Sequence, residues 1–237
     1  MSANPYSPSQ LGVRPAPALV QQLLVGAFGW MFAGLLLSAG VAYLVGSSEP
    51  LLTTVAQWWL PILIGQFVLA LVIQGAINKL SAVAALGMFF IYAASMGLTI
   101  GLIVWSVMQQ EGGVAAVASA FFSASAMFGA AALYGAVTKR DLAGMGGILF
   151  MGLIGIIVAS IVNLFLQNGA LGWVISIGGV VIFTALTAFD VQKITRGEYA
   201  AWTGSKEKAS VLAALHLYLN FINLFLFMLR IFGGSRN

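Results

Sequence analysis

The chain has 237 residues, of which 61% are hydrophobic and only 7% are charged. Because a soluble domain carries about 25% charged residues, this composition excludes a soluble globular protein and indicates an integral membrane protein whose main partner is the lipid bilayer. The ten Lys and Arg residues exceed the six acids, giving a net charge of +4. They are scattered over short polar breaks and form no patch, so we expect no nucleic-acid partner.

The first stretch of the chain is rich in proline and in small polar residues. Four of the six prolines lie here: Pro5, Pro8, Pro15 and Pro17. This composition predicts a flexible tail over residues 1–22, followed by a transmembrane domain over residues 23–237. The tail lacks the basic and apolar regions of a secretory signal, so we expect the first hydrophobic span to stay in the mature protein.

About 20 apolar residues cross a bilayer as a helix, and seven stretches of the chain reach that length. They are Leu23–Val45, Val55–Ile77, Ala82–Val107, Val114–Val137, Gly144–Leu166, Leu171–Asp190 and Ser210–Phe232. The breaks between most of them are short, so consecutive helices should be antiparallel neighbours. The sequence therefore predicts an all-α integral membrane protein with a bundle of seven transmembrane helices.

The basic residues predict how the bundle is oriented, because cytoplasmic loops are enriched in Lys and Arg. Eight of the ten lie in the tail or in the second, fourth and sixth breaks: Arg14, Lys79, Lys139, Arg140, Lys193, Arg196, Lys206 and Lys208. This places the N-terminus in the cytoplasm and, after seven crossings, the C-terminus outside. An alternative topology, in which the last span dips in and returns, would put both termini in the cytoplasm.

Asp190 is the only acid embedded in a hydrophobic stretch. A charged side chain in the middle of a bilayer costs roughly 2.5–3.5 kcal/mol, so its position needs a reason. In one interpretation Asp190 lies at the interface, helps to end its helix and is partly covered by Lys193 at i+3. In the other it faces the interior of the bundle, which the polar character of the last span favours.

The last span carries polar residues at helical spacing. His216, Asn220, Asn223, Phe227 and Arg230 share one face. In lipid this face must turn inward, where it would form interhelical hydrogen bonds or line a polar path. Weaker candidates for such a lining are Tyr92, Ser95, Thr99, Ser106, Ser160, Asn163, Thr184 and Thr187.

Catalytic signatures are missing from the sequence, so we expect no enzyme. There is one embedded acid, one histidine, no G-x-S-x-G motif and no glycine-rich phosphate loop. The chain also lacks the cluster of His, Cys or acidic residues that a metal centre needs, so no metal site or resident cofactor is expected.

Three segments resemble the Bax inhibitor-1 family of membrane proteins, most closely its bacterial inner-membrane branch, the YccA- and YbhL-like proteins. The segments are Thr-Lys-Arg-Asp-Leu at 138–142, Ala-Phe-Asp-Val-Gln-Lys-Ile at 188–194 and Leu-Tyr-Leu-Asn-Phe-Ile-Asn-Leu-Phe at 217–225. The resemblance runs from the first span to the C-terminus. It implies six helices around a central polar seventh, in a multi-pass protein of the bacterial inner membrane.

The resemblance also implies a pH-sensitive calcium leak, gated by one aspartate on the sixth helix and one on the seventh. Asp190 matches the first of these, whereas Asn220 stands where the second is expected. An amide cannot titrate, so we hypothesise that Asp190 alone supplies the proton and cation switch. Protonated, it would hydrogen-bond to Asn220; ionised, it would seek a cation or a basic side chain such as Lys193, Lys79 or Arg230.

A second function stays open at this point. One bacterial relative is known as a modulator of the membrane protease FtsH, so the chain could be a non-conducting regulator that docks a membrane partner through its proline-rich tail. Calcium binding itself should be weak, because high-affinity calcium sites assemble several carboxylates.

Overall fold

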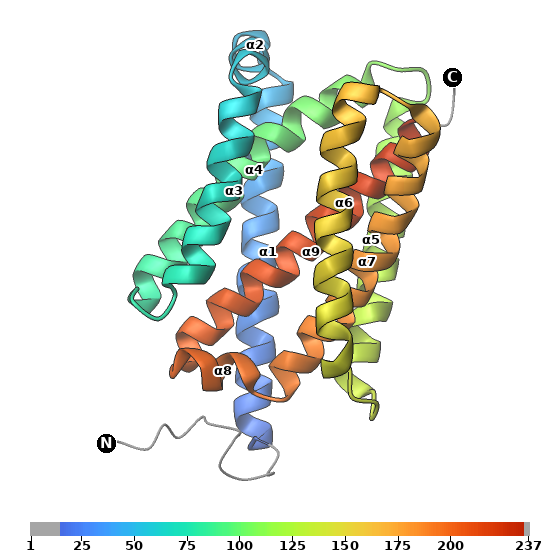
Figure 1. Cartoon of the computed structure of the whole chain (residues 1–237). Helices are drawn as coiled ribbons and strands as arrows, with labels where there is room; N and C mark the ends of the chain where they lie inside the picture. The colour runs from blue at the N-terminus through green and yellow to red at the C-terminus, as the bar shows by residue number, and fades with distance from the viewer. Residues whose placement is uncertain (1–14, 235–237) are drawn as a thin grey trace. The chain divides into compact units, whose positions relative to one another are not determined.

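The computed structural model describes residues 15–234, and within them every regular element is helical (Figure 1). The elements are α1 (Pro17–Gly46), α2 (Glu49–Gln57), α3 (Trp59–Ala76), α4 (Ala82–Met108), α5 (Gly113–Val137), the short 3-10 helix η2 (Ala143–Met145), α6 (Gly146–Leu166), α7 (Gly169–Thr195), α8 (Glu198–Thr203) and α9 (Lys206–Gly233).

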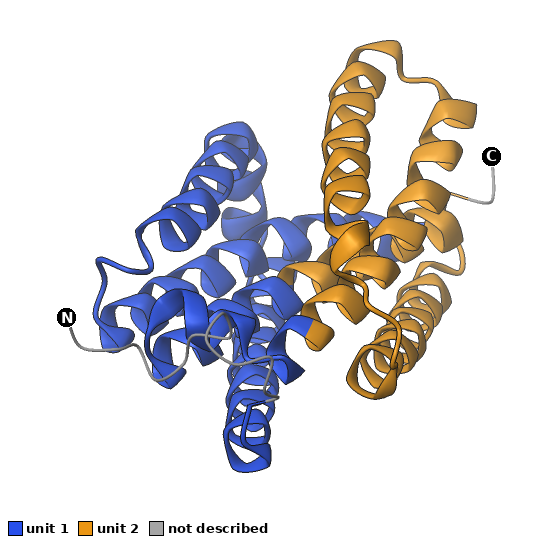
Figure 2. Ribbon diagram, turned by 60° about the horizontal axis from the view of Figure 1, so that its bottom comes forward, with its two compact units in different colours: residues 1–110, 193–218 blue, residues 111–192, 219–237 orange. Residues whose placement is uncertain are grey.

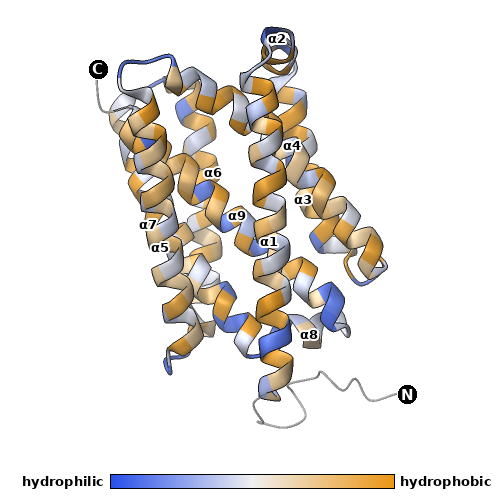
Figure 3. Cartoon of the chain, turned by 180° about the vertical axis from the view of Figure 1, so that it is seen from behind, coloured by the Kyte–Doolittle hydropathy of each residue, from blue (hydrophilic) through white to orange (hydrophobic). Residues whose placement is uncertain are grey.

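Seven of these helices are long and apolar enough to cross a membrane: α1, α3, α4, α5, α6, α7 and α9. Most of their length is coloured as hydrophobic in Figure 3, with hydrophilic residues in the turns and at a few positions within the helices. The prediction of an all-α protein with seven transmembrane helices is confirmed.

Helix α9 is the most buried of the seven. Of the residues in its most apolar stretch 72% are buried, against 11–50% in the other six spans. A helix that is surrounded by other helices can hold polar side chains that lipid would not tolerate. This burial confirms the prediction of a central seventh helix.

The start of α1 differs from the sequence prediction. The helix begins at Pro17 and not at Leu23, because a proline in the first turn has a suitable φ and lacks only an N–H that would be unpaired there. The predicted flexible tail is therefore wrong for residues 17–22. Residues 1–14, to which most of that prediction applies, lie outside the described part of the chain.

Two of the predicted breaks contain short helices. The break before the second span holds α2, with Glu49 in its first turn, and α3 then starts at Trp59. Pro61 is the third residue of α3, so it occupies the first turn and does not kink the helix. The break before the last span holds α8, which starts and ends next to glycines with left-handed backbones, Gly197 and Gly204.

The described residues form two compact units (Figure 2). Unit 1 contains the chain up to Gln110 together with Lys193–Tyr218. Unit 2 contains Glu111–Gln192 together with the chain from Leu219 onward. Helices α7 and α9 each contribute residues to both units.

In unit 1, α1 and α4 pack closely through small residues. A Cβ on Gly97 would lie 2.7 Å from the backbone oxygen of Ser38, and one on Gly101 would lie 2.8 Å from that of Ala42. The side chain of Ser38 donates to the carbonyl of Ala93 at 2.7 Å and bonds the Tyr218 hydroxyl at the same distance. The start of α9 is thereby tied to this helix pair.

In unit 2, the second half of α9 packs against α5 and α7 through aromatic rings. Phe221 contacts Phe128 edge-to-face, with ring centroids 5.5 Å apart. Further along α9, Phe227 lies 5.9 Å from Phe183 and covers Gly179, where a Cβ would come within 2.5 Å of its ring. These contacts hold the polar positions of α9 in a defined rotation about the helix axis.

Candidate functional site

Asp190 and Asn220 form a buried pair between α7 and α9. The amide Nδ2 of Asn220 donates to Oδ2 of Asp190 at 2.8 Å, and the two side chains are 5% and 4% exposed. Helix α7 continues past the carboxylate to Thr195. The interpretation that Asp190 ends its helix is therefore wrong, because α7 continues for five residues beyond it, and the carboxylate faces α9 inside the protein.

The turn of α7 that precedes Asp190 is packed closely by apolar residues. Ala131, Leu142 and Ala188 form a buried cluster, and Phe189 packs against it. At Gly135 the backbone of α5 lies so close to the carbonyl of Ala188 that a Cβ would overlap it. A carboxylate in such a setting is poorly hydrated, so a hydrogen bond from Asn220 strongly influences which protonation state it adopts.

Gln192 joins this end of α7 to the loop between α5 and α6. Its Oε1 accepts from the backbone N–H of Leu142 at 2.9 Å, and its Nε2 donates to the carbonyl of Arg140 at 2.8 Å. Gln192 is 4% exposed. Two backbone groups of the loop, which α5 and α6 leave unpaired, thus find their partners on one buried amide.

The three sequence segments that carry the family resemblance meet at this place. The loop segment 138–142 is held by Gln192, and Gln192 and Asp190 both belong to segment 188–194. Asn220, from segment 217–225, bonds Asp190. Segments that are far apart in the sequence are brought into one hydrogen-bonded site of unit 2.

Two other predicted residues form hydrogen bonds with backbone carbonyls of their own helices. The hydroxyl of Thr187 donates to the carbonyl of Phe183 at 2.7 Å, and Nδ2 of Asn223 donates to the carbonyl of Leu219 at 2.8 Å. Bonds of this kind are ordinary for hydroxyl and amide side chains in transmembrane helices. These hydrogen bonds account for the Thr187 hydroxyl and the Asn223 amide nitrogen without a ligand.

His216 belongs to a second polar cluster, in unit 1. Its Nδ1 lies 2.8 Å from the hydroxyl of Tyr199 on α8, and its Nε2 lies 3.1 Å from Oε1 of Gln74 on α3. The ammonium group of Lys193 lies 4.8 Å above the ring of Tyr199, within the range of a cation–π contact. Sequence reasoning named His216 and Lys193 but missed Tyr199 and Gln74, which carry no motif.

The hydrogen bonds of this cluster identify the neutral tautomer of His216. The amide nitrogen of Gln74 donates to the carbonyl of Ala70 at 3.1 Å, so its oxygen is the atom that faces the imidazole. An oxygen there needs a donor, which places the proton of neutral His216 on Nε2 and lets Tyr199 donate to Nδ1.

The remaining predicted residues are elsewhere. Lys79 is exposed in the turn after α3. Arg230 lies next to Gly172, near the start of α7, whereas Asp190 is 18 residues further along the same helix, or about 27 Å. The prediction that Arg230 could be the charge partner of Asp190 is therefore wrong, because the two lie at opposite ends of α7.

No group of three or more His, Asp or Glu side chains that could hold a metal ion occurs within residues 15–234. The described pair joins a buried carboxylate to an amide donor, whereas a high-affinity calcium site assembles several carboxylates. Together, the spans and this pair define a multi-pass membrane protein with an ionisable group buried between two of its transmembrane helices.

Comparison with known proteins identifies the family. Residues 20–237 match the family model described as "Inhibitor of apoptosis-promoting Bax1". The chain is 43% identical over 232 residues to the inner membrane protein YbhL of Escherichia coli, covering 94% of this chain and 96% of YbhL. It is 39% identical over 219 residues to an uncharacterized protein of Deinococcus radiodurans, with 92% of each chain covered. The chain belongs to the Bax inhibitor-1 family.

Proposed function

We propose that the protein is a pH-modulated leak for calcium or related cations in the bacterial inner membrane. Asp190 is the proton and cation switch, and Asn220 takes the place of a second aspartate. The observation that carries this proposal is the buried hydrogen bond between the two side chains, 2.8 Å long, in the interior of a transmembrane bundle. The similar E. coli protein YbhL is an inner membrane protein, which supports the location.

The pair can be satisfied in both charge states of Asp190. When the carboxylate is ionised, the amide of Asn220 donates to it, as in the described geometry. When it is protonated, a rotation of the amide about its last bond presents the oxygen as an acceptor for the new O–H. The switch therefore changes the charge between α7 and α9 while each state keeps a hydrogen bond between the two helices.

A single buried carboxylate fits a leak better than a store or a sensor. Calcium sites of high affinity use several carboxylates and take six to eight oxygen ligands. One carboxylate with amide and carbonyl oxygens holds the ion weakly and releases it quickly. Conduction requires this balance, because binding must be strong enough to admit the ion and weak enough to let it leave.

The proposal is tested by calcium flux into proteoliposomes that contain only the purified protein, measured from acidic to alkaline pH. We expect the wild-type flux to depend on pH and the flux of Asp190→Asn to lose that dependence. Glu49→Gln, which removes an exposed acid of α2, is the matched control and should keep the wild-type profile. An unchanged pH profile in Asp190→Asn would falsify the proposed switch.

The direction of the wild-type profile distinguishes two mechanisms. If the flux rises on acidification, protonation of Asp190 opens the pathway. If the flux falls, protonation removes the negative charge that attracts the cation. Asn220→Asp adds a second titrating group next to the first, so the profile should gain a further, coupled step. If the profile of Asn220→Asp equals that of the wild type, the paired geometry has no functional role.

If the purified protein conducts no cation at any pH, the result favours the alternative function. The protein would then be a non-conducting regulator of a membrane protease or of another membrane partner. Deleting residues 1–14 then supplies the discriminating measurement. Loss of co-purification with the partner, with the flux assay still negative, would assign the function to docking through the tail.

A further inference from the structure

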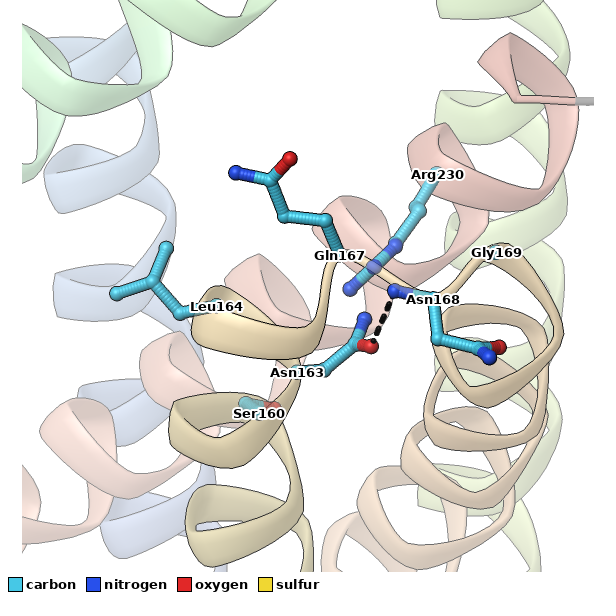
Figure 4. A pocket seen from close by; sticks show the side chains of 7 residues that line it. All are labelled: Ser160, Asn163, Leu164, Gln167, Asn168, Gly169 and Arg230. Atoms are coloured by element: carbon cyan, nitrogen blue, oxygen red, sulfur yellow. Dashed lines mark hydrogen bonds between the residues drawn. The ribbon is translucent and has the colours of Figure 1, made fainter.

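A pocket of about 330 Å³ opens in unit 2 at the turn between α6 and α7 (Figure 4). Its polar walls include Asn163 from α6, Asn168 from the turn and Arg230 from α9. No acidic side chain lines it. The pocket is separate from the Asp190–Asn220 pair, which lies about 27 Å away along α7, and the proposed leak does not use it.

Asn163 points its amide nitrogen into this pocket. The side chain is 7% exposed, and its Oδ1 accepts the backbone N–H of Asn168 at 3.1 Å. This bond fixes the amide orientation, so that the atom turned away from the turn is the donor Nδ2. Among the described residues no acceptor is found for Nδ2, and Figure 4 shows it directed toward Arg230.

Arg230 brings a second donor to the same point. A Cβ on Gly172 would lie 2.5 Å from Nη2 of Arg230 and 3.3 Å from Nδ2 of Asn163. Both nitrogens therefore lie beside Gly172, and the guanidinium takes up the space that a side chain at position 172 would need. Within residues 15–234 the guanidinium has no carboxylate partner, although a planar fork of N–H donors is suited to a bidentate oxyanion.

The turn is shaped to keep these donors together. Gln167 ends α6 with a left-handed backbone, φ 48°, which is unusual for a residue other than glycine. Asn168 then caps α7 by accepting the N–H of Leu171 at 2.9 Å. The first turn of a 27-residue helix lies beside the pocket, and its dipole adds a favourable potential for an anion.

We infer that this pocket binds a phosphate group, held by the guanidinium of Arg230 and the amide of Asn163. Two converging donors without a protein acceptor between them suit a ligand that only accepts hydrogen bonds, and a phosphate oxygen is such an acceptor. The polar turn places the pocket at the level of the membrane interface, so the phosphate can come from an anionic lipid headgroup or from free phosphate. The missing side chain at Gly172 leaves room for the guanidinium that would hold the phosphate.

The test uses the full-length protein in a maltoside detergent, which contains no phosphate. In one arm inorganic phosphate is titrated calorimetrically, with chloride as comparison. In the other arm phosphatidylglycerol is added, with diacylglycerol as the phosphate-free comparison, and retained lipid is counted by native mass spectrometry. Binding of lipid alone identifies a headgroup site, and binding of phosphate alone or of both identifies a general phosphate site.

Three variants make the outcome specific to the pocket. Arg230→Gln and Gly172→Ala should each weaken binding roughly tenfold, the first by removing the charge and the second by displacing the guanidinium of Arg230. Lys139→Gln removes an exposed cation from the other end of unit 2 and should bind as the wild type does. Equal binding by Arg230→Gln and Lys139→Gln, or no binding in either arm, overturns the inference.

Thermal unfolding confirms that each variant is folded. Arg230 is exposed, so it can be changed without loss of core packing.

Discussion

Gly135 lacks a side chain where the backbone of α7 already occupies the space. A Cβ at this position would overlap the carbonyl of Ala188, two residues before Asp190. Because a backbone carbonyl cannot turn aside as a flexible side chain can, Gly135→Ala must push α5 and α7 apart. We expect it to reduce the free energy of unfolding by about 1–3 kcal/mol.

Gly129 on the same helix provides the control for that substitution. Nothing lies within 4 Å of a Cβ at Gly129, so Gly129→Ala should leave thermal unfolding in detergent unchanged or raise its midpoint slightly, since alanine has the higher helix propensity. Equal unfolding temperatures for the two variants would show that α5 and α7 are not in close contact at Gly135.

Tyr218 contributes one hydrogen bond that can be removed with little change of shape. The hydroxyl of Ser38 has one proton, which it donates to the backbone carbonyl of Ala93. The Tyr218 hydroxyl is therefore the donor in its bond to Ser38 Oγ, 2.7 Å long. Its ring is fully buried against Phe89 and Tyr92. Tyr218→Phe keeps this packing and should cost about 1 kcal/mol of stability in thermal unfolding. Tyr134→Phe, at a ring 46% exposed, should cost nothing measurable.

At the scale of elements, the loop between α5 and α6 depends on one residue of α7. Gln192→Leu keeps the volume but leaves the N–H of Leu142 and the carbonyl of Arg140 without the partners they have now. We expect the loop to open more often, because each lost buried bond costs roughly 1–3 kcal/mol. Limited trypsin digestion measures this, since Lys139 and Arg140 in the loop are cleavage sites.

The expected result is faster cleavage at these two positions, identified by the masses of the fragments. Gln57→Leu, at an exposed position of α2, is the control and should be cleaved as the wild type is. If Gln192→Leu is cleaved at the wild-type rate, the loop is held by other contacts.

Hydrophobic length alone was sufficient to predict the seven spans, because lipid requires long apolar helices and permits little else. Hydrophobic length did not predict the helix ends and the short helices that depend on contacts within the protein. The end of α7 lies at Thr195 and not at Asp190, since a helix buried in protein can continue through polar residues. Helices α2 and α8 are short and lie outside the apolar stretches, so hydropathy gave no signal for them.

The polar site could be predicted only in part for a similar reason. Asp190 was conspicuous because it is the one acid in an apolar stretch, and the family pattern pointed to Asn220. Gln192 and Gln74 are uncharged and stand in no motif, so their roles follow only from the backbone groups and the imidazole that the fold brings to them. A hydrogen-bond partner is a property of three-dimensional neighbours.

At the scale of the whole molecule, the course of α9 decides the topology. Asn220 bonds Asp190 near the end of α7, and Arg230 reaches Gly172 near its start. The second half of α9 therefore runs beside α7, from the level of Asp190 toward the first turn of α7. A segment that dips in and returns would bring its last residues back to the end where Asp190 lies, so the contacts favour a full crossing by all seven spans.

This course leads to a prediction that reporter fusions can test in a bacterial host. With the N-terminus in the cytoplasm, as the basic residues predict, seven crossings put the C-terminus outside. Alkaline phosphatase fused after Asn237 should then be active, and green fluorescent protein at the same position should be dark. Fusions within the loop between α5 and α6, which carries Lys139 and Arg140, should behave in the opposite way. A fluorescent C-terminal fusion together with a fluorescent loop fusion would place both on the cytoplasmic side, and the crossing of α9 would be wrong.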